Sequence, residues 1–233
     1  MTLPSAVLFD VDGTLYHQSP LRAAMAAELL IAPVFQRGPR ESIQLWKMLA
    51  AFRNARERLR AKEANSQPLE SLQYEYAAEA VSVPVGLMRD AVTEWILTRP
   101  NRYLPLARRK GLRETLDWLR ARNIQVGLFS DYPTRSKAEA LGIAGSVSVH
   151  VCATDIDVNA FKPHPRGFLV ACERWAVDPA TVLYVGDRSD VDAEGARRAG
   201  MSCVLVGRGT GPGVRVRRLL DVCAVVEAFR PTQ

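Results

Sequence analysis

Residues 5–15 read Ser-Ala-Val-Leu-Phe-Asp-Val-Asp-Gly-Thr-Leu. The apolar run at residues 5–9 is typical of a strand that is buried on both faces of a parallel sheet. The run ends at Asp10, and because side chains alternate along an extended chain, Asp12 points to the same side as Asp10. Gly13 permits a sharp turn away from the strand. The stretch therefore predicts a buried strand that delivers two carboxylates to one edge of a sheet.

Apolar runs late in the chain indicate the remaining strands of this sheet. They lie at residues 124–129, 181–185, 202–206 and 222–226. Helical patterns separate the runs, at residues 111–122, 133–141, 166–176 and 190–199. Strands that alternate with helices predict an α/β fold with a doubly wound parallel sheet.

The stretch at residues 18–104 has a different pattern, without a convincing strand. Apolar stripes and breakers indicate four helices, at residues 21–35, 41–62, 69–80 and 84–97. We therefore expect two parts: a core of residues 1–17 and 105–233, and an all-helical domain of residues 18–104 inserted into that core.

Composition limits the class of protein without selecting a ligand. The chain has 233 residues, no apolar run long enough to span a bilayer, and an N-terminus without the features of a signal peptide. Its four cysteines are widely scattered, which favours reduced thiols and a cytoplasmic protein. The net charge of +6 favours anionic ligands, and both phosphate esters and nucleic acids belong to that class.

Three further elements carry side chains that suit a phosphate or a metal ion. Ser130 follows the run at residues 124–129, and its hydroxyl suits a phosphate oxygen. Lys162 lies in a Phe-Lys-Pro-His-Pro loop, and its ammonium group can neutralise phosphate charge. Asp187 directly ends the run at residues 181–185, and further acids follow it. Because ligands of open α/β sheets bind at the carboxyl ends of the strands, we expect these groups to converge with the two N-terminal carboxylates.

Each of these elements has a plainer explanation when it stands alone. A serine after a strand is common in turns, a single lysine is ordinary surface charge, and acids at a helix start often interact only with the helix dipole. That last explanation suits Asp190, but it does not suit Asp187, which directly follows a buried strand.

Together the elements resemble the four motifs of the haloacid dehalogenase (HAD) superfamily. They are Asp-x-Asp-Gly-Thr at residues 10–14, Ser130, Lys162-Pro163, and Gly-Asp-x-x-x-x-Asp at residues 186–192. The core resemblance covers about residues 1–17 and 105–230, and the helical insertion resembles the C1-type cap of that superfamily. The first and fourth motifs are specific, while the second and third support the assignment by position. The resemblance implies a Rossmann-like sheet with the first strand in its centre.

The resemblance also implies a magnesium-dependent phosphatase that acts on a small phosphorylated metabolite. Asp10 would attack the phosphorus and form an aspartyl-phosphate, and Asp12 would protonate the leaving oxygen and later deprotonate the attacking water. Mg²⁺ would be held by the Asp10 carboxylate, the Asp12 backbone carbonyl and Asp187. The predicted supporting residues are Asp192 behind the metal site, and Ser130, Lys162 and Thr14 around the phosphoryl group.

Two acids depart from or add to the family pattern. Asp131 stands where asparagine is frequent in the family, and Asp190 lies between the two aspartates of the fourth motif. We leave both out of the predicted metal site. Asp131 would either sharpen the choice of substrate or cap the next helix.

Other functions remain open at this point. A phosphotransferase such as a sugar-phosphate mutase would use the same motifs, and a non-catalytic binding protein could retain the same fold. A dehalogenase is disfavoured, because carbon–halogen hydrolysis needs neither Asp12 nor a metal at Asp187. The basic residues of one predicted helix are expected to form a solvated face that attracts phosphorylated substrates rather than nucleic acid. They are Arg53, Arg56, Arg58, Arg60 and Lys62. The identity of the substrate and the oligomeric state are not predicted.

Overall fold

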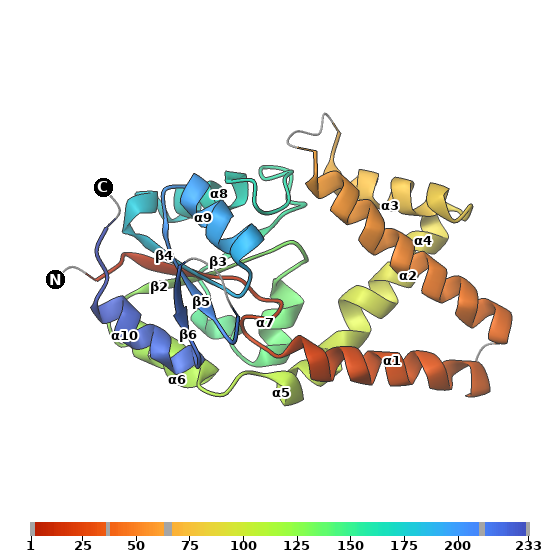
Figure 1. Cartoon of the computed structure of the whole chain (residues 1–233), viewed down its shortest axis with the longest axis horizontal. Helices are drawn as coiled ribbons and strands as arrows, with labels where there is room; N and C mark the ends of the chain where they lie inside the picture. The colour runs from red at the N-terminus through yellow and green to blue at the C-terminus, as the bar shows by residue number, and fades with distance from the viewer. Residues whose placement is uncertain (1–2, 36–37, 63–66, 210–212, 232–233) are drawn as a thin grey trace.

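A six-stranded parallel sheet forms the centre of the computed structural model, which describes residues 3–35, 38–62, 67–209 and 213–231 (Figure 1). The strand order is β3-β2-β1-β4-β5-β6, and every neighbouring pair is parallel. The strands are β1 (Ala6–Phe9), β2 (Gln125–Ser130), β3 (Val149–Cys152), β4 (Val182–Gly186), β5 (Ser202–Val206) and β6 (Val214–Val216). The first strand therefore lies inside the sheet, as predicted.

The apolar run of β1 explains its central place. All four of its residues are fully buried, and they alternate between two hydrophobic clusters: Val7 and Phe9 face one, and Ala6 and Leu8 face the other. Phe9 is level with Leu128 of β2 and with Val185 of β4. This register brings the carboxyl ends of the three strands to one edge.

Helices cover both faces of the sheet, which makes it doubly wound. One face packs against α6 (Leu112–Arg120), α7 (Arg135–Leu141) and α10 (Val222–Glu227). The other face packs against α8 (Arg166–Trp175) and α9 (Glu194–Arg198). Short turns of other helix types complete this part: η3 (Ala144–Ser146), η4 (Pro179–Thr181), η5 (Ser189–Ala193) and η6 (Leu219–Asp221).

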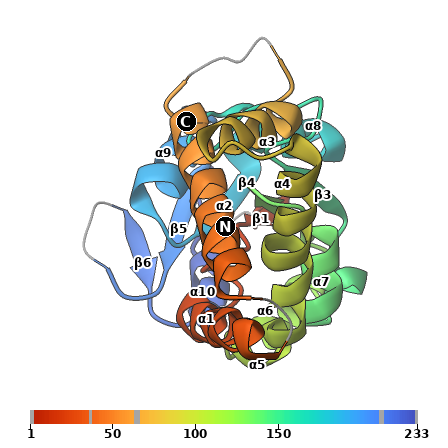
Figure 2. The same ribbon diagram turned by 90° about the vertical axis from the view of Figure 1, so that its right-hand side faces the viewer.

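Between β1 and α6, the described residues from Gln18 to Ala107 are largely helical and lie beside the carboxyl edge of the sheet (Figures 1 and 2). We call them the helical part, and the rest of the described chain the sheet part. The elements of the helical part are α1 (Gln18–Phe35), α2 (Pro39–Arg60), α3 (Leu69–Ala80), α4 (Val85–Val92), η1 (Thr93–Thr98), η2 (Arg99–Tyr103) and α5 (Leu104–Ala107). Within the described part of residues 18–104 there is no strand. Among the described helices, none combines the length and the apolar character that crossing a membrane requires.

The chain leaves the sheet part and returns to it through two adjacent backbone segments. Tyr16 and Arg108 form an antiparallel bridge, the His17 N–H donates to the Ala107 carbonyl, and the Arg109 N–H donates to the Leu15 carbonyl, both at 2.9 Å. The helical part is thus attached through a paired, two-stranded connection.

The prediction of a strand at residues 222–226 is wrong, because this run lies in helix α10. Val222 and Val226 are fully buried, whereas Ala224 between them is exposed. This spacing is helical, and a five-residue apolar run cannot separate a buried strand from one side of a helix. Two short strands were also missed, β3 and β6, whose apolar residues are interrupted by His150 and Arg215.

Candidate active site

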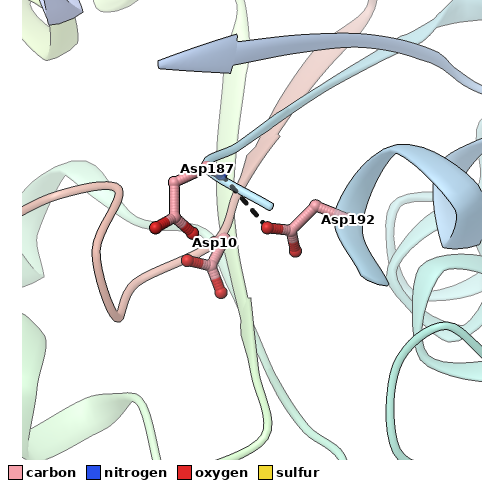
Figure 3. Close-up of side chains that lie close together, drawn as sticks. All are labelled: Asp10, Asp187 and Asp192. Atoms are coloured by element: carbon pink, nitrogen blue, oxygen red, sulfur yellow. Dashed lines mark hydrogen bonds between the residues drawn. The ribbon is translucent and has the colours of Figure 1, made fainter. Parts of the chain in front are cut away.

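Three neighbouring strands bring the predicted site residues together. Asp10 follows β1, Ser130 ends β2 and Asp187 follows β4. One carboxylate oxygen each from Asp10, Asp187 and Asp192 lies within 4.8 Å of the others (Figure 3). The two aspartates on which the predicted chemistry depends, Asp10 and Asp187, are therefore neighbours in space although 177 positions apart (187 − 10) in the sequence.

Asp10 is buried and both of its carboxylate oxygens are oriented by hydrogen bonds. Oδ1 accepts from Lys162 Nζ at 2.5 Å, and Oδ2 accepts from Thr14 Oγ1 at 2.9 Å. Its backbone N–H donates to the Val185 carbonyl at 2.8 Å. A carboxylate held in this way has a fixed direction, which a nucleophile needs.

The Lys162 ammonium group links Asp10, which follows β1, to Asp192, which lies in the turn η5. Lys162 is 3% exposed, and Nζ donates to Asp10, to Asp192 Oδ1 at 2.8 Å and to the Tyr184 hydroxyl at 3.0 Å. Asp192 Oδ2 accepts the backbone N–H groups of Asp187 (3.1 Å) and Arg188 (3.0 Å). Because Asp192 Oδ2 already accepts two backbone N–H groups of the loop that carries Asp187, Asp192 suits a supporting place behind the metal ligands.

Asp12 has a lysine of its own, which the sequence analysis missed. Lys137 Nζ lies 2.5 and 2.7 Å from the two carboxylate oxygens of Asp12. Ser130 Oγ donates to Asp12 at 2.8 Å, and the Tyr16 hydroxyl donates to it as well. Lys137 lies on α7, and the sequence carries no signal for its burial, because a lysine on a helix is exposed by default.

The charges around these aspartates shift their pKa values in different directions. Burial raises the pKa of Asp10 well above its ordinary value, opposed by Lys162 and reinforced by the neighbouring aspartates. Burial also raises the pKa of Asp187 to about 6, with Asp192 adding to the rise. Burial alone would raise the pKa of Asp12, but the charge and the hydrogen bonds of Lys137 bring it below its ordinary value.

The residues at this edge fit a divalent cation. Four carboxylates, from Asp10, Asp12, Asp187 and Asp192, face two lysine ammonium groups, and in the described part of the chain no hydrogen bond is donated to the Asp187 carboxylate. Carboxylate oxygens are the ligands that hard divalent cations prefer. A cation between Asp10 and Asp187 would stabilise their ionised forms, which burial and the neighbouring aspartates disfavour. This buried aspartate cluster can therefore hold a metal ion.

The backbone next to Asp12 approaches Asp187 closely. Gly13 has a φ of +107°, and a Cβ atom at this position would overlap the Asp187 carboxylate. The Asp12 carbonyl, a predicted metal ligand, accepts a hydrogen bond from Gln18 Nε2 at 2.6 Å. A carbonyl oxygen has two lone pairs, so this hydrogen bond leaves one for a cation.

The predicted solvated face of the basic helix is partly wrong. Arg53, Arg58 and Lys62 are exposed, but Arg56 is only 4% exposed and Arg60 is largely buried. The Arg56 guanidinium lies between the rings of Tyr132 (3.9 Å to the centroid) and Phe161 (4.5 Å). The reason is that the carboxyl end of α2 packs against the sheet part, which covers one side of the helix.

The two acids that were left out of the metal site have other partners. Asp131 Oδ2 pairs with Arg60 Nη1 at 2.9 Å, and Asp190 pairs with Arg188 at the surface. Neither belongs to the cluster of aspartates that could hold a metal ion.

The fold and this site define a hydrolase class, and the comparisons with known proteins agree. The chain belongs to the haloacid dehalogenase-like hydrolases, whose family model matches residues 4–200. It is 28% identical to a phosphoglycolate phosphatase of Pseudomonas fluorescens Pf-5, over 91% of this chain and 72% of that protein. It is 27% identical to a glyceraldehyde 3-phosphate phosphatase of Methanopyrus kandleri, over 93% and 90% of the two chains.

Solved structures show that the fold serves more than one reaction. A HAD phosphatase from Thermococcus onnurineus matches with a TM-score of 0.65 and 22% identity, over 95% of this chain and 97% of that chain. A 2-haloacid dehalogenase from Pseudomonas syringae pv. tomato DC3000 matches with the same score and identity, over 97% and 99%. The fold therefore does not separate phosphatase from dehalogenase, and the side chains of the site must do so.

Proposed function

We propose that this protein is a magnesium-dependent phosphatase that hydrolyses a small phosphomonoester through an aspartyl-phosphate on Asp10. The observation that carries the proposal is the second carboxylate, Asp12, held beside Asp10 by its own buried lysine, with Asp187 completing an acidic site. Hydrolysis of a carbon–halogen bond needs neither of these additional acids. The names of the two relatives, both phosphatases of small phosphorylated compounds, support the same reaction.

The residues of the site divide the reaction between them. A carboxylate oxygen of Asp10 forms a bond to phosphorus while the bond from phosphorus to the leaving oxygen breaks. Asp12 is a carboxylate in the free site, so it takes up a proton when the protonated phosphate monoester binds and then gives that proton to the leaving oxygen. In the second step Asp12 takes a proton from water, the water oxygen bonds to phosphorus, and the bond to Asp10 breaks. Lys162 offsets negative charge, and Thr14 keeps the Asp10 carboxylate oriented.

Magnesium is the cation that we propose for the acidic cluster. Asp10, the Asp12 carbonyl and Asp187 would hold it, with Asp192 behind them. When bound, Mg²⁺ supplies positive charge to the phosphoryl oxygens. Ser130 remains a predicted phosphate ligand, although its hydroxyl donates to Asp12 in this structure.

The helical part supports a proposal about selectivity. We keep the predicted division into a core of residues 1–17 and 105–233 and a C1-type cap of residues 18–104, because the helices lie beside the reactive edge (Figure 1). The cap would select a small phosphorylated metabolite. A cytoplasmic location and the absence of a nucleic-acid partner also stay predictions.

The test is hydrolysis of p-nitrophenyl phosphate with and without Mg²⁺, followed by a panel of esters that includes phosphoglycolate and glyceraldehyde 3-phosphate. Asp10→Asn should abolish turnover and the phosphoryl adduct detected by mass spectrometry after acid quench. Asp190→Asn is the matched control, because it removes the same charge from an exposed side chain near the site. Magnesium-dependent turnover that survives in Asp10→Asn, or a folded wild type that is inactive on every ester, would contradict the proposal.

A further inference from the structure

An ion pair between the helical part and the sheet part holds the backbone of Lys162. Arg60 Nη1, on the last residue of α2, donates to the Lys162 carbonyl at 2.6 Å and lies 2.9 Å from Asp131 Oδ2. Asp131 Oδ1 accepts the Lys162 N–H at 3.3 Å. Both polar groups of the Lys162 backbone are thus bound by one pair of side chains, which we call the Arg60–Asp131 clamp.

The surroundings keep both members of the clamp in place. Each side chain is 14% exposed. Arg60 also pairs with Glu57 at 3.1 Å, and the buried Arg56 donates to the Asp131 carbonyl at 2.7 Å. The positive charges of Arg60, Lys162 and Arg56 outweigh the effect of burial and lower the pKa of Asp131, so this carboxyl is ionised at neutral pH.

The end of α2 is also anchored by apolar contacts and by a backbone hydrogen bond. Leu59, near the end of α2, and Leu69, the first residue of α3, belong to the hydrophobic cluster that contains Phe161. The Leu69 N–H donates to Asn159 Oδ1 at 2.6 Å. Asn159 and Phe161, which precede Lys162 in the chain, are therefore both in contact with the helical part.

The clamp explains the unusual acid at position 131. An aspartate has two acceptor oxygens, so Asp131 can serve the Lys162 N–H with one and Arg60 with the other. An asparagine has only one acceptor oxygen, and its amide group would face a donor. Asp131 therefore suits a site that must hold an arginine and a backbone N–H at once.

We propose that Arg60 and Asp131 are positioning residues for Lys162, and that they make the reactive site depend on how α2 is seated on the sheet part. The Lys162 side chain is buried and its ammonium group is bound by Asp10, Asp192 and Tyr184, so it has little room to adjust when its backbone shifts. The effect on turnover rests on the proposed phosphatase function, whereas the effect on the Lys162 backbone does not.

The experiment compares Arg60→Gln and Asp131→Asn with Arg58→Gln, an exposed arginine on the same helix. Both clamp variants should lower kcat on p-nitrophenyl phosphate by about 10- to 100-fold with little change in KM, since a misplacement near 1 Å costs on that order. Hydrogen exchange of the peptide that contains Lys162 should become faster in both. Arg60→Lys should restore part of kcat, because it keeps the charge but donates to fewer partners.

A double variant tests whether the clamp acts through the Lys162 side chain: Arg60→Gln is introduced into Lys162→Ala. In that background, Arg60→Gln should lower the remaining kcat no further. An equal additional loss, or an Arg58→Gln variant as impaired as Arg60→Gln, would overturn the proposal. So would unchanged hydrogen exchange, or faster exchange with unchanged kcat.

The two proposals fail in distinguishable ways. If the wild type is inactive on every ester but exchange becomes faster in the clamp variants, the proposed function fails and the structural part of the clamp stands. Circular dichroism establishes that each variant is folded, and if Arg60→Gln does not fold, Asp131→Asn and Arg60→Lys carry the test.

Discussion

Replacing Asp187 with asparagine should stabilise the metal-free protein and at the same time remove its response to magnesium. Burial and the nearby Asp192 raise the pKa of Asp187 from 3.8 to about 6, so its negative charge destabilises the folded state at neutral pH. Asparagine has nearly the same shape without the charge. Stability and metal binding are thus expected to change in opposite directions.

The size of the effect follows from the shift in pKa. A rise of about two pKa units corresponds to roughly 3 kcal/mol at about 1.4 kcal/mol each, which is the largest gain that removal of this charge can produce. For a protein of this length, about 1 kcal/mol moves the unfolding midpoint by roughly 2–4 °C, so Asp187→Asn should raise it by up to roughly 6–12 °C.

The pH dependence has a definite sign. The pKa of Asp187 is higher in the folded state than in the unfolded state, so its protonated carboxyl favours folding. This contribution to the free energy of unfolding is fully present below about pH 4 and is lost as the pH rises through about 6. The difference between Asp187→Asn and the wild type should be absent at the acidic end of this window and complete above it.

The assay is thermal unfolding followed by fluorescence, with EDTA and with Mg²⁺, at several pH values. Magnesium at a hundred times its Kd should stabilise the wild type by about 2.7 kcal/mol and should not stabilise Asp187→Asn. Asp190→Asn serves as the control, since its exposed pair with Arg188 is worth at most about 1 kcal/mol. The reasoning is refuted if Asp187→Asn lowers the midpoint in EDTA, or if magnesium still stabilises it as much as the wild type.

Three other substitutions test separate parts of the structure. Lys137→Met removes the charge that lowers the pKa of Asp12, so the limb of the pH–rate profile that reports Asp12 should move to higher pH, as measured by kcat/KM across the pH range. Gly13→Ala places a methyl group against the Asp187 carboxylate at a positive φ, and it should cost about 1–3 kcal/mol of stability and weaken magnesium binding in a calorimetric titration. Phe168→Ala empties a fully buried site between two aromatic rings and should cost about 3–5 kcal/mol in urea unfolding. A loss below about 1 kcal/mol for Phe168→Ala would show that the ring is not part of the core.

Much of the fold could be predicted where a local pattern has one structural explanation. The apolar run before Asp10 was assigned as a strand because two acids and the Gly13 turn follow it directly, and residues 69–80 form α3 with the predicted bounds. The run at residues 222–226 was misassigned because its apolar side chains fit a strand and a helix equally well. The edge strand β6 has three residues, too few to show a period.

The candidate site was predictable as far as it depends on strand ends. Asp10 and Asp187 each follow a buried apolar run, so the parallel topology was enough to bring them together. Lys137 and Arg60 reach the site from helices, and their positions depend on how those helices pack. A charged residue on a helix is exposed by default, and only tertiary contacts show which ones are buried.

The paired connection at Tyr16 and Arg108 has a consequence for the evolution of this protein. Its two backbones hydrogen-bond to each other, so about ninety intervening residues could be exchanged for a different segment without moving the ends of β1 or α6. Such an exchange keeps Asp10, Asp12 and Asp187, but it removes Arg60, so a new segment would have to hold the Lys162 backbone with a group of its own. Related proteins built on this plan could therefore acquire new substrates while keeping the same reacting aspartates.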